Sequence, residues 1–228
     1  MSLSFTWLGH SAFRLDIDGH VVIIDPFLTG NPLAPIRPEE ISPELILVSH
    51  GHGDHVGDTV EIAKRTQAPV ISNFEIGNWL RKQGVENTVG LNLGGTYQGA
   101  FCKVKSTIAH HSSSLPDGTY AGNPMGFVIS TDQLKLYYAG DTCPFTEMAW
   151  IGDMGIDVAF LPIGDLFTMG IEDSLKAIEL VRPRFVVPMH YATFPPIMQD
   201  GGAWASRVNN MTNATPIVLD PGGKYTIN

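Results

Sequence analysis

The amino-acid sequence predicts an α/β fold in which two β-sheets pack against each other and helices cover the outside. Short apolar, strand-like runs dominate the chain. In each of two successive parts of the chain, helix-like segments interrupt these runs. A length of 228 residues allows one sizeable hydrophobic core. Because the sequence contains no linker, no low-complexity tract and no clear repeat, we expect a single domain that spans residues 1–228.

The first part of the chain combines strands with two helices. We expect strands over residues 5–16, 21–24, 45–48 and 69–71, and helices over residues 59–66 and 75–83. Asp18-Gly19 is typical of a hairpin turn between the first two strands. Residues 28–43 contain four prolines, which indicates a loop, and loops of this length are often functional. Asp58 and Asn73 are expected to cap the two helices.

The remainder of the chain is rich in strands. We expect one or two strands over residues 97–108, further strands over residues 125–130, 134–138, 156–161, 185–189 and 217–219, and helices over residues 173–181 and 202–209. Thr131-Asp132 marks the turn that pairs two of these strands. Pro183 ends the helix that precedes it, because proline lacks the amide proton that a helix needs.

Composition and charge narrow the functional class. The formal net charge is -9 and no segment gathers Lys and Arg, whereas nucleic-acid binding usually needs a basic face. We therefore expect no nucleic-acid partner. Cys102 and Cys143 give no disulfide framework, which fits a reducing, cytoplasmic compartment. The sequence starts without the basic region of a signal peptide, and no apolar run is long enough to cross a membrane, so no membrane partner is expected.

The most informative motif lies directly after the apolar run at residues 45–48. Three histidines and one aspartate fall within six consecutive positions, as His50-x-His52-x-Asp54-His55. Imidazole nitrogen and carboxylate oxygen are ligands that suit zinc, iron and manganese. The intervening glycines permit a narrow turn, so alternate side chains can converge on one point. This strand end is therefore predicted to hold a metal ion.

Further candidate ligands follow the ends of three other predicted strands. They are His110 or His111, Asp141 and His190. One such residue alone is weak evidence, since a histidine at a strand end usually has a structural role. Together they are strong evidence, because six of the eight histidines fall in these clusters.

With these ligands in this order, the chain resembles the metallo-β-lactamase superfamily. More narrowly, it resembles a family of uncharacterised metal-dependent hydrolases close to the ascorbate-6-phosphate lactonases. The strings that narrow the family are Trp7-Leu8-Gly9-His10-Ser11, Ile24-Asp25-Pro26, Ala139-Gly140-Asp141-Thr142, Leu161-Pro162-Ile163-Gly164-Asp165, Phe167-Thr168-Met169-Gly170 and Pro188-Met189-His190-Tyr191. The resemblance covers almost the whole chain. It implies a four-layer αββα sandwich with metal ions at one edge between the sheets.

The resemblance also implies a ligand set for two metal ions. One ion would be held by His50, His52 and His111, the other by Asp54, His55 and His190, with Asp141 bridging both. His111 is preferred because the family pattern places this ligand directly before a serine, and His110 is the alternative. Leu166 stands where the family pattern has an asparagine, a difference that concerns the substrate pocket rather than the metal ions.

Such a site implies a hydrolase whose nucleophile is a metal-activated water. Zinc is the expected ion, and manganese or iron also fits. Asp54 is a candidate for orienting the water. His10 either lines the pocket and donates a proton or hydrogen bond to the substrate, or fixes a ligand, and Asp25 is expected to hydrogen-bond a ligand histidine.

The expected partner is a small-molecule substrate, either a lactone, an ester or a phosphodiester. The alternatives are a nuclease of the same superfamily, which the acidic balance disfavours, and a metal-binding protein without turnover. The sequence leaves the oligomeric state open, a homo-oligomer included.

Overall fold

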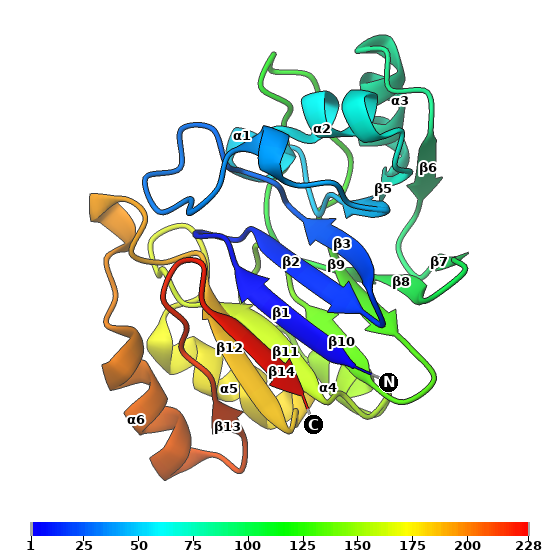
Figure 1. The fold of residues 1–228 in the computed structure, drawn as a ribbon. Coiled ribbons are helices and arrows are strands. Elements are labelled where there is room, and N and C mark those ends of the chain that lie inside the picture. The colour runs from blue at the N-terminus through cyan, green and yellow to red at the C-terminus, as the bar shows by residue number, and fades with distance from the viewer. Residues whose placement is uncertain (1, 228) are drawn as a thin grey trace.

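The computed structural model describes residues 2–227 and shows two β-sheets packed face to face, with helices on their outer faces (Figure 1). The strands are β1 (Leu3–Trp7), β2 (Phe13–Ile17), β3 (His20–Ile24), β4 (Leu45–Leu47), β5 (Val70–Asn73), β6 (Thr88–Leu91), β7 (Thr96–Gln98), β8 (Lys103–Ile108), β9 (Met125–Ser130), β10 (Lys135–Tyr138), β11 (Val158–Pro162), β12 (Phe185–Met189), β13 (Thr215–Pro216) and β14 (Lys224–Ile227). The helices are α1 (Gly53–Val56), α2 (Thr59–Thr66), α3 (Phe74–Lys82), α4 (Met148–Gly152), α5 (Ile171–Val181) and α6 (Gly201–Met211), with 3-10 turns η1 (Pro38–Glu40) and η2 (Pro195–Ile197). The predicted αββα sandwich is therefore confirmed.

The two sheets have related strand arrangements. The first has the order β14-β1-β2-β3-β4-β5-β6 and the second has the order β13-β12-β11-β10-β9-β8-β7. In each sheet, antiparallel strands adjoin a parallel run, which is β3 to β6 in the first and β10 to β13 in the second. Parallel neighbours end at the same edge of a sheet, so β3 and β4 end side by side, as do β10, β11 and β12.

The main hydrophobic core lies between the two sheets. Phe5 and Phe13 of the first sheet meet Phe160 of the second, with ring centroids 5.2 Å and 4.7 Å from it, and all three are fully buried. Burial of each such side chain contributes about 1.5–3 kcal/mol. A second cluster joins the first sheet to α2 and α3, where Ile46 of β4 and Ile76 of α3 are fully buried. Strand β4 is apolar at every position because both of its faces are covered.

The two residues expected to cap helices behave differently. Asn73 accepts a hydrogen bond from the amide of Ile76 at 2.9 Å and so caps α3 as predicted. Asp58 precedes α2, whose bounds match the prediction, but its carboxylate makes no cap. It accepts instead from the amides of Leu28 and Thr29 at 2.9 Å and 2.8 Å. The predicted Asp58 cap is therefore wrong, and Asp58 anchors the start of the long loop.

Two predicted strands are also wrong. Residues 5–16 form two strands rather than one, because the chain turns between β1 and β2, where Gly9 and His10 have φ values of +87° and +54°. Residues 217–219 lie outside any strand, since the pairing with β12 is made earlier, by β13. The structure adds β6, β14 and the helices α1 and α4, each of which is only four or five residues long and therefore too short for a clear periodic pattern.

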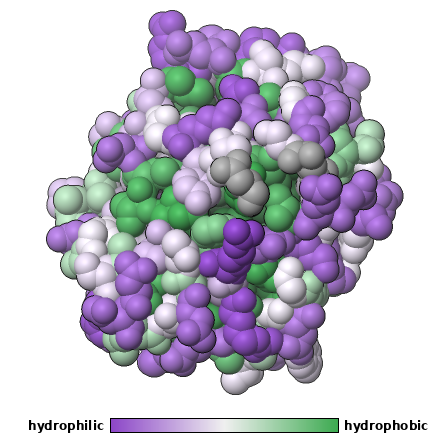
Figure 2. Space-filling view, turned by 60° about the horizontal axis from the view of Figure 1, so that its bottom comes forward, coloured by the Kyte–Doolittle hydropathy of each residue, from purple (hydrophilic) through white to green (hydrophobic). Residues whose placement is uncertain are grey.

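Both ends of the described chain lie at the end of the sandwich away from the turn at Gly9. Leu3 pairs with both Ile227 and Ile17, so the β2–β3 hairpin turn lies beside these ends. Figure 2 shows this face, where hydrophobic side chains reach the surface among hydrophilic ones. Within residues 2–227, no helix is both long enough and apolar enough to cross a membrane.

We predict that Gly164→Ala destabilises the fold. A Cβ atom at this position, just after β11, would collide with the carbonyl oxygen of His190 and lie 3.1 Å from Cβ of Ile197. Overpacking of this kind costs about 1–3 kcal/mol. Gly53→Ala is the matched control, since its Cβ would meet no atom within 4 Å. Urea unfolding of the metal-free proteins should show the loss for Gly164→Ala alone, and equal unfolding free energies would contradict the prediction.

Candidate metal centre

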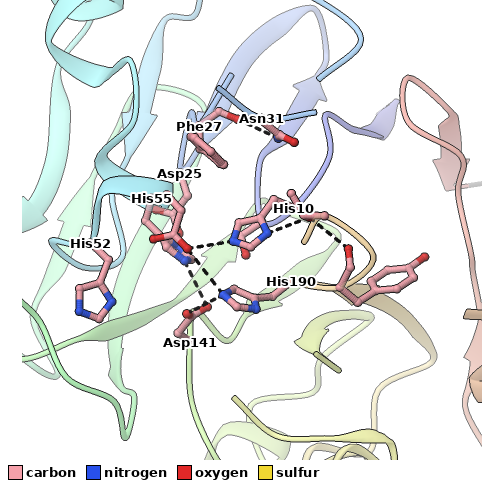
Figure 3. Close-up of polar contacts among 12 residues, drawn as sticks. His10, Asp25, Phe27, Asn31, His52, His55, Asp141 and His190 are labelled. Carbon is pink, nitrogen blue, oxygen red and sulfur yellow. Dashed lines mark hydrogen bonds and ion pairs between the residues drawn. The ribbon is translucent and has the colours of Figure 1, made fainter. Parts of the chain in front are cut away.

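The residues predicted to bind metal follow strands that end at one edge of the sandwich. Strand β4 leads into residues 49–55, β8 leads to His111, β10 to Asp141 and β12 to His190. Figure 3 shows side chains from several of these segments pointing toward one another. The topology therefore brings together donor atoms that lie far apart in the sequence.

Three histidines form one group of donor atoms. Nε2 of His50 lies 3.0 Å from Nδ1 of His52, and ring nitrogens of His50, His52 and His111 all lie within 4.8 Å of one another. Nitrogen ligands about 2.0–2.1 Å from a tetrahedral ion are about 3.4 Å apart, so this spacing suits a shared ion. His50 is fully buried, whereas His52 and His111 are partly exposed.

A second group of donor atoms comes from Asp54, His55 and His190, which also lie within 4.8 Å of one another. Asp141 contacts both groups. Its Oδ1 is 3.3 Å from Nε2 of His55, while its Oδ2 is 3.0 Å from Nε2 of His190 and 3.6 Å from Nε2 of His111. All seven predicted ligands therefore lie in one cluster, with Asp141 shared between its two parts.

Three buried atoms of the cluster make no hydrogen bond within the described residues, one of them Nδ1 of His190. The other two, Nε2 of His55 and Oδ1 of Asp141, lie 3.3 Å apart and face each other. Leaving a buried polar atom unpaired costs about 1–3 kcal/mol. A divalent cation would satisfy both atoms, and imidazole and carboxylate are donors that such ions accept. The residues present therefore fit a bound metal ion.

Burial and mutual charge set the pKa values in the cluster. Burial lowers the pKa of His50 well below its usual value, so this imidazole is neutral and its nitrogen is free to bind metal. Burial raises the pKa of Asp141 and of Asp54, but neighbouring histidines outweigh it and hold both values below the usual range. Both carboxylates are therefore ionised, as metal binding requires.

Asp25, a fully buried carboxylate, supports the cluster from behind. Its Oδ2 accepts hydrogen bonds from Nδ1 of His55 at 2.7 Å and from the hydroxyl of Tyr138 at 2.8 Å. Ser49 donates its amide to Oδ1 at 2.7 Å and its hydroxyl to Oδ2. The expected contact between Asp25 and a predicted ligand histidine is confirmed. It leaves Nε2 of His55 directed toward Asp141.

His10 lies in the same cluster, at the turn after β1. Its ring is fully buried, with Nε2 3.1 Å from Oδ2 of Asp54 and Nδ1 2.9 Å from Oγ1 of Thr193 (Figure 3). Burial lowers the pKa of His10 to about 4, although the hydrogen bond with Asp54 opposes the shift. Its contact with Asp54 agrees with a role in fixing a ligand, and a role toward substrate stays a prediction.

The structure separates His111 from its alternative. His110 is exposed, with its ring 5.0 Å from that of Phe145, and only His111 reaches the other donors.

Thr193 and Tyr138 contact the cluster although no sequence pattern singled them out. A threonine in a loop and a tyrosine in a strand are too common to carry such a signal. Leu166 is 67% exposed in the loop after β11.

The open side of the cluster combines polar and aromatic surface. The side chain of Asp54 is 34% exposed. The rings of Phe27 and Phe194 each lie 5.8 Å from the ring of His10, and a cavity of about 270 Å³ opens beside His111. Asp54 and His111 are therefore the ligand side chains that can be approached from outside the cluster.

Known proteins are similar to this chain in sequence. A family model described as the beta-lactamase superfamily domain matches residues 4–190. A UPF0173 metal-dependent hydrolase of Thermus thermophilus is 53% identical over 201 residues, which cover 88% of this chain and 89% of that protein. A UPF0173 metal-dependent hydrolase of Methanopyrus kandleri is 45% identical over 228 residues, which cover 98% of this chain and 99% of that protein.

A solved structure is similar over the full length. Igni18, described as a novel metallo hydrolase from the archaeon Ignicoccus hospitalis, is 38% identical in sequence to this chain. The two structures have a TM-score of 0.92, and their alignment covers 100% of this chain and 99% of that one. These matches confirm the predicted superfamily, while the narrower likeness to ascorbate-6-phosphate lactonases stays a prediction. The chain belongs to the metallo-β-lactamase superfamily and, within it, to the UPF0173 metal-dependent hydrolases.

Proposed function

We propose that the chain is a dinuclear hydrolase that acts on a small lactone, ester or phosphodiester. The observation that carries the proposal is the position of Asp141, whose carboxylate lies within 3.6 Å of histidines from both donor groups. Two groups of three donors that share one carboxylate suit a pair of ions in a hydrolytic site. Zinc is the proposed ion, and manganese or iron suits the same nitrogen and oxygen donors.

Such ions, when bound, supply a water that is nucleophilic near neutral pH and polarise the oxygen of the scissile bond. The chain's own residues prepare the reaction. Asp54, ionised and partly exposed, is placed to orient the attacking water. Asp25 holds the His55 ring through Nδ1, so this ligand keeps one orientation while substrate enters.

A small substrate agrees with the charge of the protein and with the mouth of the site. The net charge of -9 opposes the approach of a long polyanion such as nucleic acid. Residues 28–43 and 191–203 are the proposed specificity loops. Phe27, just before the first, and Phe194, in the second, both border His10, so an apolar group on the substrate has rings to pack against.

We predict that the metal-free protein takes up about two divalent ions per chain from Zn²⁺ or Mn²⁺, because the cluster contains two donor groups. Elemental analysis after desalting measures the ratio. His52→Ala and His190→Ala should each lose about one ion, whereas His20→Ala, at the distant start of β3, should lose none. A ratio near zero that neither zinc, manganese nor iron restores would sink the proposal.

We predict that Asp54→Ala lowers kcat/KM by at least about 100-fold, since an acid–base group of this kind typically contributes 10²–10⁴-fold. Asp132→Asn, in the exposed turn between β9 and β10, is the control for loss of a carboxylate far from the site. Circular dichroism and urea unfolding check that both variants fold. Full activity in a folded Asp54→Ala protein would remove Asp54 from the mechanism.

A hydrolysis panel on metal-loaded protein tests the substrate class. We expect turnover of one class among lactones, carboxylic esters, thioesters and phosphodiesters, abolished by a chelator and restored by metal. Turnover of nucleic acid alone would favour the nuclease alternative. A fully loaded protein that hydrolyses none of these compounds would favour a metal-binding protein without turnover.

A further inference from the structure

The backbone of His10 has a strained conformation that two hydrogen bonds hold in place. Its φ of +54° lies in the left-handed region, which strains any residue other than glycine. Its carbonyl oxygen accepts hydrogen bonds from the indole of Trp7 at 2.9 Å and from the amide of His190 at 3.0 Å. These contacts fix the imidazole beside the second donor group, with its ring centroid 4.2 Å from that of His190.

The partners of His10 indicate which ring nitrogen carries a proton. The hydroxyl of Thr193 donates to the carbonyl oxygen of Tyr191 at 3.2 Å. The same oxygen lies 2.9 Å from Nδ1 of His10, and with its proton committed to Tyr191 it can only accept from that nitrogen. A neutral imidazole has one ring proton. When Nδ1 carries it, Nε2 presents a lone pair.

That lone pair faces the carboxylate of Asp54. Nε2 of His10 lies 3.1 Å from Oδ2 of Asp54, and an ionised carboxylate only accepts hydrogen bonds. Two lone pairs at this distance repel each other unless a cation lies near both. Metal-bound histidines show the same pattern, with one N–H donated to an oxygen and the other nitrogen free for the ion.

We propose that Nε2 of His10 is an additional ligand of the second metal ion, beside Asp54, His55 and His190. Candidate donor atoms of these four residues lie within 4.8 Å of one another. The second ion then has one protein ligand more than the first, because Asp141 serves both. Such a position suits an ion that accepts more ligands than tetrahedral zinc does. The proposal rests on the metal centre proposed above and is independent of the substrate.

The competing arrangement places the proton on Nε2. His10 then donates to Asp54 as a positioning residue, and Thr193 has to turn its hydroxyl from Tyr191 toward Nδ1 of His10. The two arrangements differ in the position of one proton, which nitrogen NMR reads directly.

The decisive experiment is ¹⁵N NMR of the histidine rings in labelled, zinc-loaded protein, with the metal content of the same sample measured separately. His10→Gln identifies the His10 signals by their loss. We expect a proton on Nδ1 and none on Nε2, and a shift of the Nε2 resonance between metal-free and zinc-loaded protein. A His10 ring that keeps its proton on Nε2 in the zinc-loaded protein overturns the proposal. Failure to hydrolyse any substrate would refute the proposed function and leave this result standing.

Metal affinity provides a second measurement. His10→Ala should weaken binding of the second ion by about 100-fold or more. Loss of a residue that only hydrogen-bonds a metal ligand typically lowers metal affinity by about 10- to 100-fold. Thr193→Val, which removes the acceptor for Nδ1, should weaken it by about tenfold, and Thr193→Ser should restore it. His20→Ala is the matched control, since that side chain is 44% exposed at the far end of the sandwich. Equal affinity in folded His10→Ala and wild-type protein overturns the ligand assignment.

Discussion

The organisation of the site depends on one buried carboxylate. Asp25 is fully buried, and a carboxylate removed from water is tolerated only where hydrogen bonds replace its hydration. Its donors come from both sheets, because Ser49 and His55 follow β4 of the first sheet and Tyr138 lies in β10 of the second. Burial, together with the charge of Asp25, holds the pKa of Tyr138 well above its usual value, so the hydroxyl remains a donor. The interaction that satisfies Asp25 therefore also joins the two sheets at the edge where the metal ligands meet.

The same carboxylate orients a histidine in each donor group. It accepts directly from Nδ1 of His55, and it accepts the hydroxyl proton of Ser49, whose oxygen lies 3.0 Å from Nδ1 of His50. Both rings are thereby turned so that their Nε2 atoms face Asp141. Two carboxylates thus contact the rings of His50 and His55 on opposite sides. Asp25 orients both rings through their Nδ1 atoms, directly for His55 and through Ser49 for His50, and Asp141 lies beside their Nε2 atoms.

The features that the sequence predicts correctly are those whose residues lie close together along the chain or at the end of an apolar strand. The four ligands of the His50–His55 motif are recognisable because they fall within six consecutive positions, and Asp141 and His190 because each follows an apolar strand. The contacts of Tyr138 and Thr193 join residues far apart in the sequence, so no local pattern contains them. Strand β14 has only four residues, at an edge of its sheet, and α4 is a single short turn, so neither is long enough to give a clear periodic signal.

The error at residues 5–16 has a physical cause that concerns the site itself. Trp7 pairs with Phe13, so an even number of positions separates two residues that point to the same face. The period-two pattern of β1 is therefore in phase with that of β2, so the pattern alone cannot reveal the turn between them. The turn is nevertheless where His10 takes its left-handed backbone and reaches Asp54. Predictions from local sequence tend to fail where tertiary contacts hold a residue in a strained backbone conformation at a functional site. Here those contacts are the hydrogen bonds that Trp7 and His190 donate to the carbonyl oxygen of His10.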